Sequence, residues 1–139
     1  MNVFISHAND GADLARELTR RLRKEGLRVW LAQEEILPGD NWAERISEAL
    51  NDSQAMVVLV TPEAIRSNHV EWDIGFALGS KAYRHRLLPV LVGDTAQTQF
   101  PALPWALERF HFLRLAKPEG LDRLVQEITE SLVAVTDLR

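Results

Sequence analysis

The fold is decided by an apolar run and by the segment that follows it. The run is Ala55-Met56-Val57-Val58-Leu59-Val60, and the segment is Ser67-Asn68-His69-Val70-Glu71-Trp72-Asp73-Ile74-Gly75-Phe76-Ala77-Leu78. Consecutive apolar residues predict a strand buried on both faces, and the helical spacing of apolar residues in the segment predicts a helix running to about Ala82. Because loops at the carboxyl ends of strands in an open α/β sheet converge on one edge, we expect a ligand site where this helix begins.

Upstream of this stretch, the sequence predicts a strand, a loop and a helix. Asn2–Ser6 is short and apolar on both faces, as a strand between two helical layers should be. The loop His7–Gly11 follows, and Asn9 or Asp10 can cap a helix that ends at Gly26. The apolar positions of this helix are Leu14, Ala15, Leu18 and Leu22. Cations that suit the helix dipole lie toward its C-terminal end, at Arg20, Arg21, Arg23 and Lys24.

The next unit contains a second strand, a connection and a second helix. Leu27–Leu31 is the predicted strand, and Ala32–Ile36 is predicted to be a long exposed connection. A turn follows in which Gly39 is free to adopt a positive φ. Asp40 or Asn41 is then expected to cap the helix. Its predicted apolar face consists of Trp42, Ile46, Ala49 and Leu50.

The C-terminal half continues the alternation of strands and helices. Leu87–Val92 is a predicted fourth strand, and Pro89 removes one of its ladder donors, which fits a weakly paired side. Residues 94–109 are predicted to be an irregular or short helical crossover, followed by a fifth strand at Phe110–Leu113. The last helix is expected to begin at Pro118–Glu119.

Strands that alternate with helices of this length predict a parallel sheet with right-handed crossovers. We therefore expect an α/β flavodoxin-like, doubly wound fold with strand order 2-1-3-4-5 and helices on both faces. No internal repeat or long linker divides the sequence, so residues 1–139 are expected to form a single domain.

Composition narrows the class of function. The chain is 46% hydrophobic and 26% charged, which is typical of a globular domain. Its formal net charge of −4 gives no broad reason to bind a polyanion, so nucleic acid is not an expected partner. The absence of cysteines and of histidines at metal-binding spacing argues against a metal site. Without a leader-like segment or a long apolar run, we expect a cytoplasmic domain and no membrane partner.

Four blocks of sequence carry a family resemblance. The first two are Phe4–His7, at the first strand, and Gly26–Trp30, at the second. The other two are Ile36–Trp42, around the turn, and Ser67–Val70 together with Asp73, Ile74 and Ala77. In this order they resemble the first strand, second strand, BB loop and active-site helix of the TIR (Toll/interleukin-1 receptor) domain family, in its prokaryotic-looking form. The resemblance implies a flavodoxin-like fold.

The resemblance also implies an activity. Many TIR domains hydrolyse NAD⁺ in signalling or defence, releasing nicotinamide and leaving ADP-ribose or a cyclised product. Their essential residue is a glutamate on the active-site helix, and Asp73 occupies that position here, with Glu71 as the second choice. A carboxylate near the ribose stabilises the oxocarbenium character that develops when this bond breaks. Two positions depart from the family pattern, because His69 replaces a tryptophan and Ala32 replaces a usual aspartate.

Residues around the same edge are expected to bind the substrate. His7 can stack on or bond a ligand beside Ser6, and His69 and Trp72 can form walls of a nicotinamide or adenine pocket. NAD⁺ is the expected substrate, and no prosthetic group is expected. The BB loop commonly mediates homotypic TIR–TIR assembly in the family. The apolar tip that would do so here consists of Ile36, Leu37, Pro38 and Gly39.

Other functions stay open or are disfavoured by particular residues. A non-catalytic TIR adaptor is one alternative, and a nucleoside deoxyribosyltransferase is a distant one, since it shares this sheet type and uses a carboxylate at a glycosidic carbon. A two-component receiver would need paired acids where Ser6 and His7 stand. A Rossmann oxidoreductase would need a GxGxxG turn, which the loop Ser6–Gly11 lacks.

Overall fold

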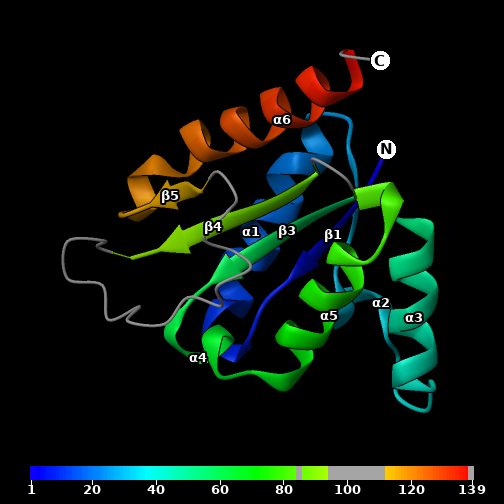
Figure 1. The fold of residues 1–139 in the computed structure, drawn as a ribbon. Helices are drawn as coiled ribbons and strands as arrows, with labels where there is room; N and C mark the ends of the chain where they lie inside the picture. The colour runs from blue at the N-terminus through cyan, green and yellow to red at the C-terminus, as the bar shows by residue number, and fades with distance from the viewer. Residues whose placement is uncertain (84–85, 94–111, 138–139) are drawn as a thin grey trace.

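The computed structural model describes residues 1–83, 86–93 and 112–137 of the chain. Within them, five strands form one parallel sheet in the order β2-β1-β3-β4-β5 (Figure 1). The strands are β1 (Asn2–Ser6), β2 (Arg28–Trp30), β3 (Ala55–Val60), β4 (Leu87–Val92) and β5 (Leu113–Leu115). The flavodoxin-like fold and the strand order predicted from the sequence are confirmed.

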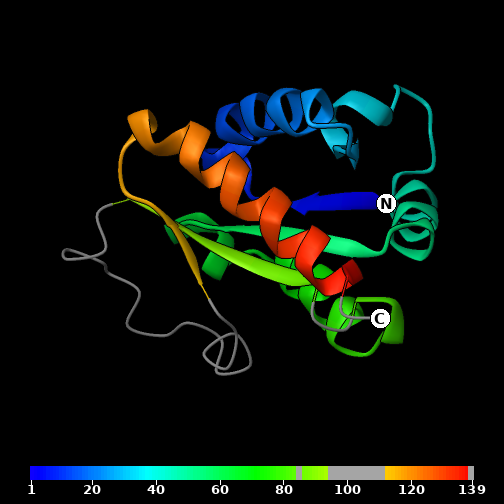
Figure 2. The ribbon, with the colours of Figure 1, turned by 90° about the horizontal axis from the view of Figure 1, so that it is seen from above.

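Helices cover both faces of this sheet, as predicted. They are α1 (Ala12–Lys24), α2 (Ala32–Glu35), α3 (Trp42–Asp52), α4 (Pro62–Ile65), α5 (Asn68–Leu78) and α6 (Leu121–Asp137). Short 3₁₀ turns occupy Asn9–Gly11, Lys81–Tyr83 and Pro118–Gly120. Figure 2 shows α1 and α6 on one side of the sheet and α5 on the other. Two layers of helices therefore enclose the sheet.

The central strand β3 explains why its sequence is apolar at every position. All six of its residues are buried. Alternate side chains point to opposite faces of a strand, so Val57 and Leu59 pack in the cluster that contains the inner faces of α1 and α6. Met56 and Val58 pack in the second cluster, with the inner faces of α3 and α5. Each face of β3 thus contributes to a separate core.

The structure corrects two predictions about element type and position. Ala32–Ile36 is not simply the long exposed connection that the sequence predicted, because α2 occupies most of it and the partly buried Ile36 packs against the core. The fifth strand is Leu113–Leu115 rather than Phe110–Leu113, with Leu113 and Leu115 buried on either side of the exposed Arg114. Phe112 precedes this strand, while residues 110 and 111 and the predicted crossover at 94–109 lie outside the described residues.

The predicted helix boundaries and caps are partly correct. Asn41 caps α3, since its Oδ1 accepts a hydrogen bond from the Glu44 amide at 3.1 Å. The cap predicted for α1 is wrong: a 3₁₀ turn precedes that helix, and the Asp10 carboxylate accepts instead from Thr61 Oγ1 at 2.6 Å. Gly39 has φ +94°, as predicted. The helix α5 ends at Leu78 rather than near residue 82.

Candidate active site

A cavity of about 490 Å³ opens at the carboxyl ends of β1 and β2, the edge where the sequence predicted a ligand site. Its volume lies within the range of small-molecule sites, about 300 to 1,000 Å³. The polar part of its lining comes from Ser6, His7, Asn9, Gln33, His69 and Asp73. The apolar part includes Ile36, Leu37, Pro38, Trp42 and Ile46. Residues distant in sequence therefore surround one hollow.

The carboxylate of Asp73 is the most unusual group in this cavity. Asp73 is only 4% exposed, because it lies on the inner side of α5 together with Val70 and Ile74. Burial raises its pKa to about 6, while the hydrogen bond from Ser6 and the charge of His69 act in the opposite direction. Ser6 Oγ donates to Asp73 Oδ2 at 2.8 Å. The carboxylate is therefore fixed to the end of β1 and titrates near neutral pH.

The start of α5 is tied to the loop after β1 through His69. The Ser67 hydroxyl caps the helix by accepting from the Val70 amide at 3.3 Å, and it also bonds His69 Nδ1 at 2.9 Å. The other ring nitrogen, Nε2, lies 2.9 Å from the His7 carbonyl oxygen. Because a carbonyl oxygen can only accept, His69 Nε2 carries a proton. The ring of Trp42 meets His69 edge-on, with centroids 6.3 Å apart.

The structure brings together some of the predicted site residues and not others. Ser6, His7, His69 and Asp73 all line the cavity. Glu71 and Trp72 do not line it, and both are exposed. Their positions follow from helix geometry, since residues one and two places before Asp73 are rotated away by about 100° and 200°. The Trp72 ring instead lies 6.4 Å from that of Phe76, one turn along the same helix.

Three of the four residues predicted to mediate assembly, and Trp42, border the same cavity. Ile36, Leu37 and Pro38 contribute to its lining, and the Leu37 side chain is 64% exposed. The sequence placed Trp42 on the buried face of α3, but it is 51% exposed at the cavity rim. One signal in the sequence could have placed Trp42 at the site. It directly follows the capping Asn41, and the first residue of a helix that begins at this edge borders the site.

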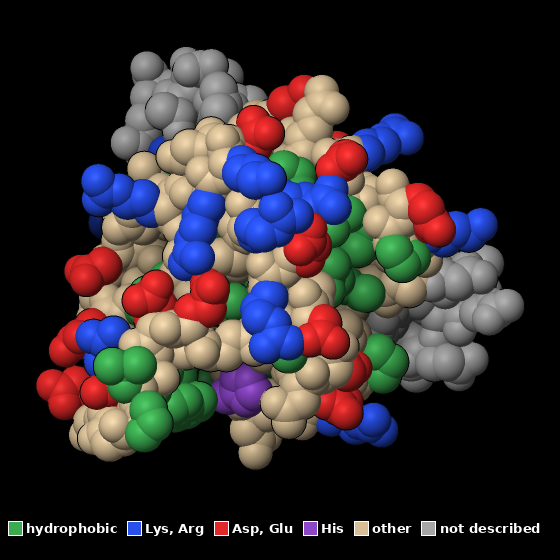
Figure 3. Space-filling model, turned by 180° about the vertical axis from the view of Figure 1, so that it is seen from behind, with side chains coloured by type: hydrophobic (Ala, Val, Ile, Leu, Met, Phe, Trp, Pro, Cys, Tyr) green, Lys and Arg blue, Asp and Glu red, His purple; other side chains and the backbone are tan. Residues whose placement is uncertain are grey.

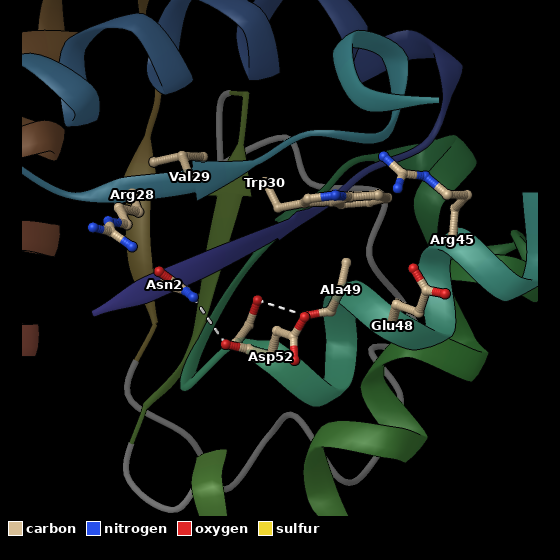
Figure 4. Close-up of a pocket in the computed structure, with 9 residues that line it drawn as sticks. Asn2, Arg28, Val29, Trp30, Arg45, Glu48, Ala49 and Asp52 are labelled. Carbon is tan, nitrogen blue, oxygen red and sulfur yellow. Dashed lines mark hydrogen bonds between the residues drawn. The ribbon is translucent and has the colours of Figure 1, made fainter. Parts of the chain in front are cut away.

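A second hollow, of about 270 Å³, lies between β2 and α3 (Figure 4). Arg28, Val29 and Trp30 line it from the strand, and Arg45, Glu48, Ala49 and Asp52 line it from the helix. Trp30 is held in place by stacking on Phe4, with centroids 5.1 Å apart. We call this hollow the α3 groove. No pattern in the sequence predicts this groove.

Two further kinds of site are absent from the described residues. No group of three or more His, Asp or Glu side chains there is placed to hold a metal ion. No helix in those ranges combines the length and the apolar character needed to cross a membrane.

These features define a class of protein. It is a doubly wound α/β domain with a buried carboxylate at the carboxyl edge of its sheet. The particular family follows from comparison, because residues 3–125 match the family model described as "TIR domain". That range covers most of the chain, so the chain belongs to the TIR domain family, and the resemblance noted in the sequence is confirmed.

Relatives and solved structures agree with this assignment. The chain is 32% identical over 130 residues to "Probable 2' cyclic ADP-D-ribose synthase BdTIR" of Brachypodium distachyon, covering 83% of this chain and 55% of that protein. It is 26% identical over 133 residues to "NAD(+) hydrolase TcpA" of Theionarchaea archaeon (strain DG-70-1), covering 94% and 40%. The TIR domain of the Toll-related receptor TRR-2 from Hydra magnipapillata superposes with a TM-score of 0.71 at 18% identity, covering 92% of this chain and 94% of that one. The chain thus spans about half or less of the two relatives' lengths.

Proposed function

We propose that this domain cleaves the nicotinamide–ribose bond of NAD⁺, with Asp73 as the carboxylate at the ribose. The proposal rests on the Asp73 carboxyl group. This group is buried beside a cavity of ligand size, it accepts a hydrogen bond from Ser6, and its pKa is raised. Perturbed carboxylates in clefts are enriched at catalytic sites. Two relatives that match most of this chain are named for NAD⁺ hydrolysis and for cyclic ADP-ribose synthesis, which supports the same chemistry.

The chemistry requires one negative charge near the reacting carbon. Nicotinamide in NAD⁺ is already cationic, so it leaves as a neutral molecule without a proton donor. The ribose carbon gains positive character as the bond lengthens, and an ionised Asp73 stabilises that charge. Attack by water then gives ADP-ribose, whereas attack by a hydroxyl of the same molecule gives a cyclised product. Because the pKa of Asp73 is about 6, the reactive carboxylate form predominates above that pH.

Neighbouring side chains are suited to holding the substrate. Ser6 orients the Asp73 carboxylate through their 2.8 Å hydrogen bond. His7 and His69 form the polar wall on the β1 side, and the exposed ring of Trp42 offers an aromatic surface at the rim. Glu71 and Trp72 are outside this arrangement. Asp73 therefore remains the first choice for the catalytic carboxylate, and Glu71 loses support.

The direct test is nicotinamide release from NAD⁺ by concentrated protein, followed by chromatography. We expect Asp73→Ala to lower turnover by about 100-fold or more, the scale expected when a charge-stabilising group is removed. Glu71→Ala should keep turnover, because this carboxylate points away from the cavity. Asp73→Glu restores the longer side chain of the catalytic relatives, so its turnover should equal or exceed that of the natural chain. Glu119→Ala, at an exposed position remote from the cavity, is the matched control.

The same assay separates the alternatives. No turnover in the natural chain or in Asp73→Glu, under conditions that drive assembly, would contradict the proposal and favour the adaptor. Release of a base from a deoxynucleoside, without cleavage of NAD⁺, would favour the deoxyribosyltransferase.

We further propose that the tip Ile36, Leu37, Pro38 and Gly39 contacts a second copy and completes the cavity. Support comes from the exposure of Leu37, 64%, at the cavity mouth. Specific activity should then rise with protein concentration, and Gly39→Ala should reduce that rise because Gly39 has φ +94°. Gly26→Ala is a matched control, since Gly26 has φ +91° and equally open surroundings. Equal effects of both variants, or strictly proportional activity, would contradict a role for the tip.

A further inference from the structure

Asp10 belongs to the loop that joins β1 to α1, but its carboxylate bonds to a different part of the chain. Asp10 Oδ1 accepts from Thr61 Oγ1 at 2.6 Å, and Oδ2 accepts from the Glu63 amide at 3.3 Å. In return, the Asp10 amide donates to Glu63 Oε2 at 3.3 Å. Thr61 directly follows β3, which pairs with β1, and Glu63 lies in the first turn of α4. The loop after β1 is therefore bonded to the carboxyl end of the neighbouring strand.

Thr61 is a firmly held partner for this carboxylate. It is buried at the end of β3, and its Oγ1 caps α4 by accepting from the Ala64 amide at 3.2 Å. A hydroxyl oxygen that accepts in this way can still donate its own proton, which goes to Asp10. A hydrogen bond to a carboxylate is charge-assisted and about twice as strong as a neutral one. The end of β3 thus determines where the Asp10 carboxylate lies.

The same loop forms one wall of the cavity. His7 and Asn9 line the cavity, whereas Asp10 does not. His7 Nδ1 lies 2.8 Å from the Ala8 carbonyl oxygen, so Nδ1 carries a proton and Nε2 is left to accept from a ligand. In Figure 3, histidine appears at the lower edge of the molecule, beside hydrophobic side chains. The histidines of the described residues are His7 and His69, so this part of the cavity wall is open to a ligand from solvent.

Two links hold this loop, one toward each end. Toward β1, the His7 carbonyl oxygen accepts from His69 Nε2 at 2.9 Å. Toward α1, Asp10 is bonded to Thr61 and to the first turn of α4. Asn9 lies between the two links. A wall that is fixed before a ligand arrives loses less conformational freedom on binding, so it binds the ligand more tightly. Without the Asp10 link, the loop would be held only toward β1.

The carboxylate of Asp73 is held by other parts of the molecule. Ser6, which bonds Asp73, is the last residue of β1 and is paired in the sheet with Val58. Asp73 itself is buried on the inner side of α5. Removing the Asp10 link should therefore displace His7 and Asn9 and leave the bond between Ser6 and Asp73 intact.

We propose that Asp10 is a positioning residue that holds the loop His7–Gly11 in the conformation that binds the substrate. The inference rests on the proposed function, since it concerns the same cavity and the same substrate. Asp10 lies outside the cavity lining and acts through His7 and Asn9. Its loss should weaken the binding of NAD⁺ and leave the chemical step at Asp73 unchanged.

The test measures KM and kcat separately for nicotinamide release from NAD⁺. Asp10→Ala should raise KM about tenfold with little change in kcat, because the wall is no longer fixed before the substrate binds. Thr61→Val removes the hydroxyl that donates to Asp10, so it should raise KM by a similar factor, whereas Thr61→Ser keeps the hydroxyl and should keep the natural KM. Asp10→Asn retains an oxygen that can accept from Thr61, so most of the loss should be restored.

Two further variants separate this link from a general effect on the fold. Asp10→Ala combined with Thr61→Val should raise KM no more than either change alone, because both remove the same bond. Asp13→Ala is the matched control, since Asp13 is an exposed acid in the first turn of α1 that pairs with Arg16 of the same helix. Its KM should equal that of the natural chain. The pH at which turnover reaches half its maximum should not shift in Asp10→Ala.

Several outcomes would overturn the inference. They are an unchanged KM in Asp10→Ala, a KM in Asp10→Asn or Thr61→Ser as high as in the variants that remove the bond, and a fall in kcat at constant KM. A chain that binds NAD⁺ without releasing nicotinamide would refute only the proposed function. Calorimetry would then decide the inference, since Asp10→Ala should raise the Kd for NAD⁺ by the same factor. A natural chain that neither binds nor cleaves NAD⁺ would overturn both.

Discussion

The cavity that contains Asp73 and the α3 groove both contain carboxylates, but these carboxylates differ in their exposure to water. Asp73 is 4% exposed, whereas Glu48 and Asp52 are exposed side chains. Burying an ionised carboxyl group costs free energy, and this cost is the reason that the pKa of Asp73 is raised to about 6. Exposed acids cost little individually and can exchange partners. The comparison separates a carboxyl group held at one buried point from carboxylates that remain in contact with solvent.

The largest expected effect concerns the pH dependence of stability. The Asp73 carboxyl has an ordinary pKa of 3.8 and a folded-state pKa of about 6. Between these values the folded state holds more protons than the unfolded state, so the free energy of unfolding falls as pH rises and the loss is complete above about pH 6. The loss should reach about 3 kcal/mol. Urea unfolding from pH 4 to 7.5 measures the effect. The free energy of unfolding of Asp73→Asn should not show this decrease, so over that range it should rise relative to that of the natural chain by about 3 kcal/mol.

A constant stability difference between the two chains over that range would break the comparison, because it would mean that Asp73 is solvated like the groove acids. Glu48→Gln is the control from the groove. It should track the natural chain across the same pH range.

A smaller effect is expected from the hydroxyl that bonds Asp73. Ser6 donates to the ionised carboxylate at 2.8 Å and so lowers its pKa. Ser6→Ala should raise the pH at which turnover reaches half its maximum by about one unit, with less effect on maximal turnover. Ser53→Ala is the matched control, since Ser53 is equally buried but donates to the Ala49 carbonyl oxygen at the α3 groove. A shift of the same size in both variants would show that the change is structural.

The sequence predicted those parts of the fold whose signals are local. The apolar run of β3, the positive φ of Gly39 and the Asn41 cap each depend on a few neighbouring residues, and each is as predicted. The meeting of Ser6 with Asp73 followed from parallel topology, because both lie at the carboxyl edge of the sheet.

The errors lie where distant contacts decide the outcome. The short helix α2 has too few residues to be predicted from periodicity, and an ion pair between Arg23 of α1 and Glu34 helps hold it. Trp42 shares the helical spacing of Ile46, but it is 51% exposed at the cavity, and apolar spacing alone does not show which end of such a face lies beyond the core. Trp72 is adjacent to Asp73 in sequence, yet one step around a helix places it in solvent.

The smallest expected effect tests whether an exposed acid of α3 contributes to the stability of the fold. Glu48 lies between two like charges, Glu44 and Asp52, each four residues away. Glu48→Lys replaces two repulsions with two attractions, but it also places a like charge three residues after Arg45. The free energy of unfolding should therefore rise by only about 0.5 kcal/mol in low salt, and Glu48→Gln should give about half of this gain. Urea unfolding at a protein concentration too low for association measures the effect, which should shrink in high salt because the charges are exposed. If Glu48→Lys instead destabilises the isolated chain, the Glu48 carboxylate contributes to the fold of the monomer, and the contrast with Asp73 fails.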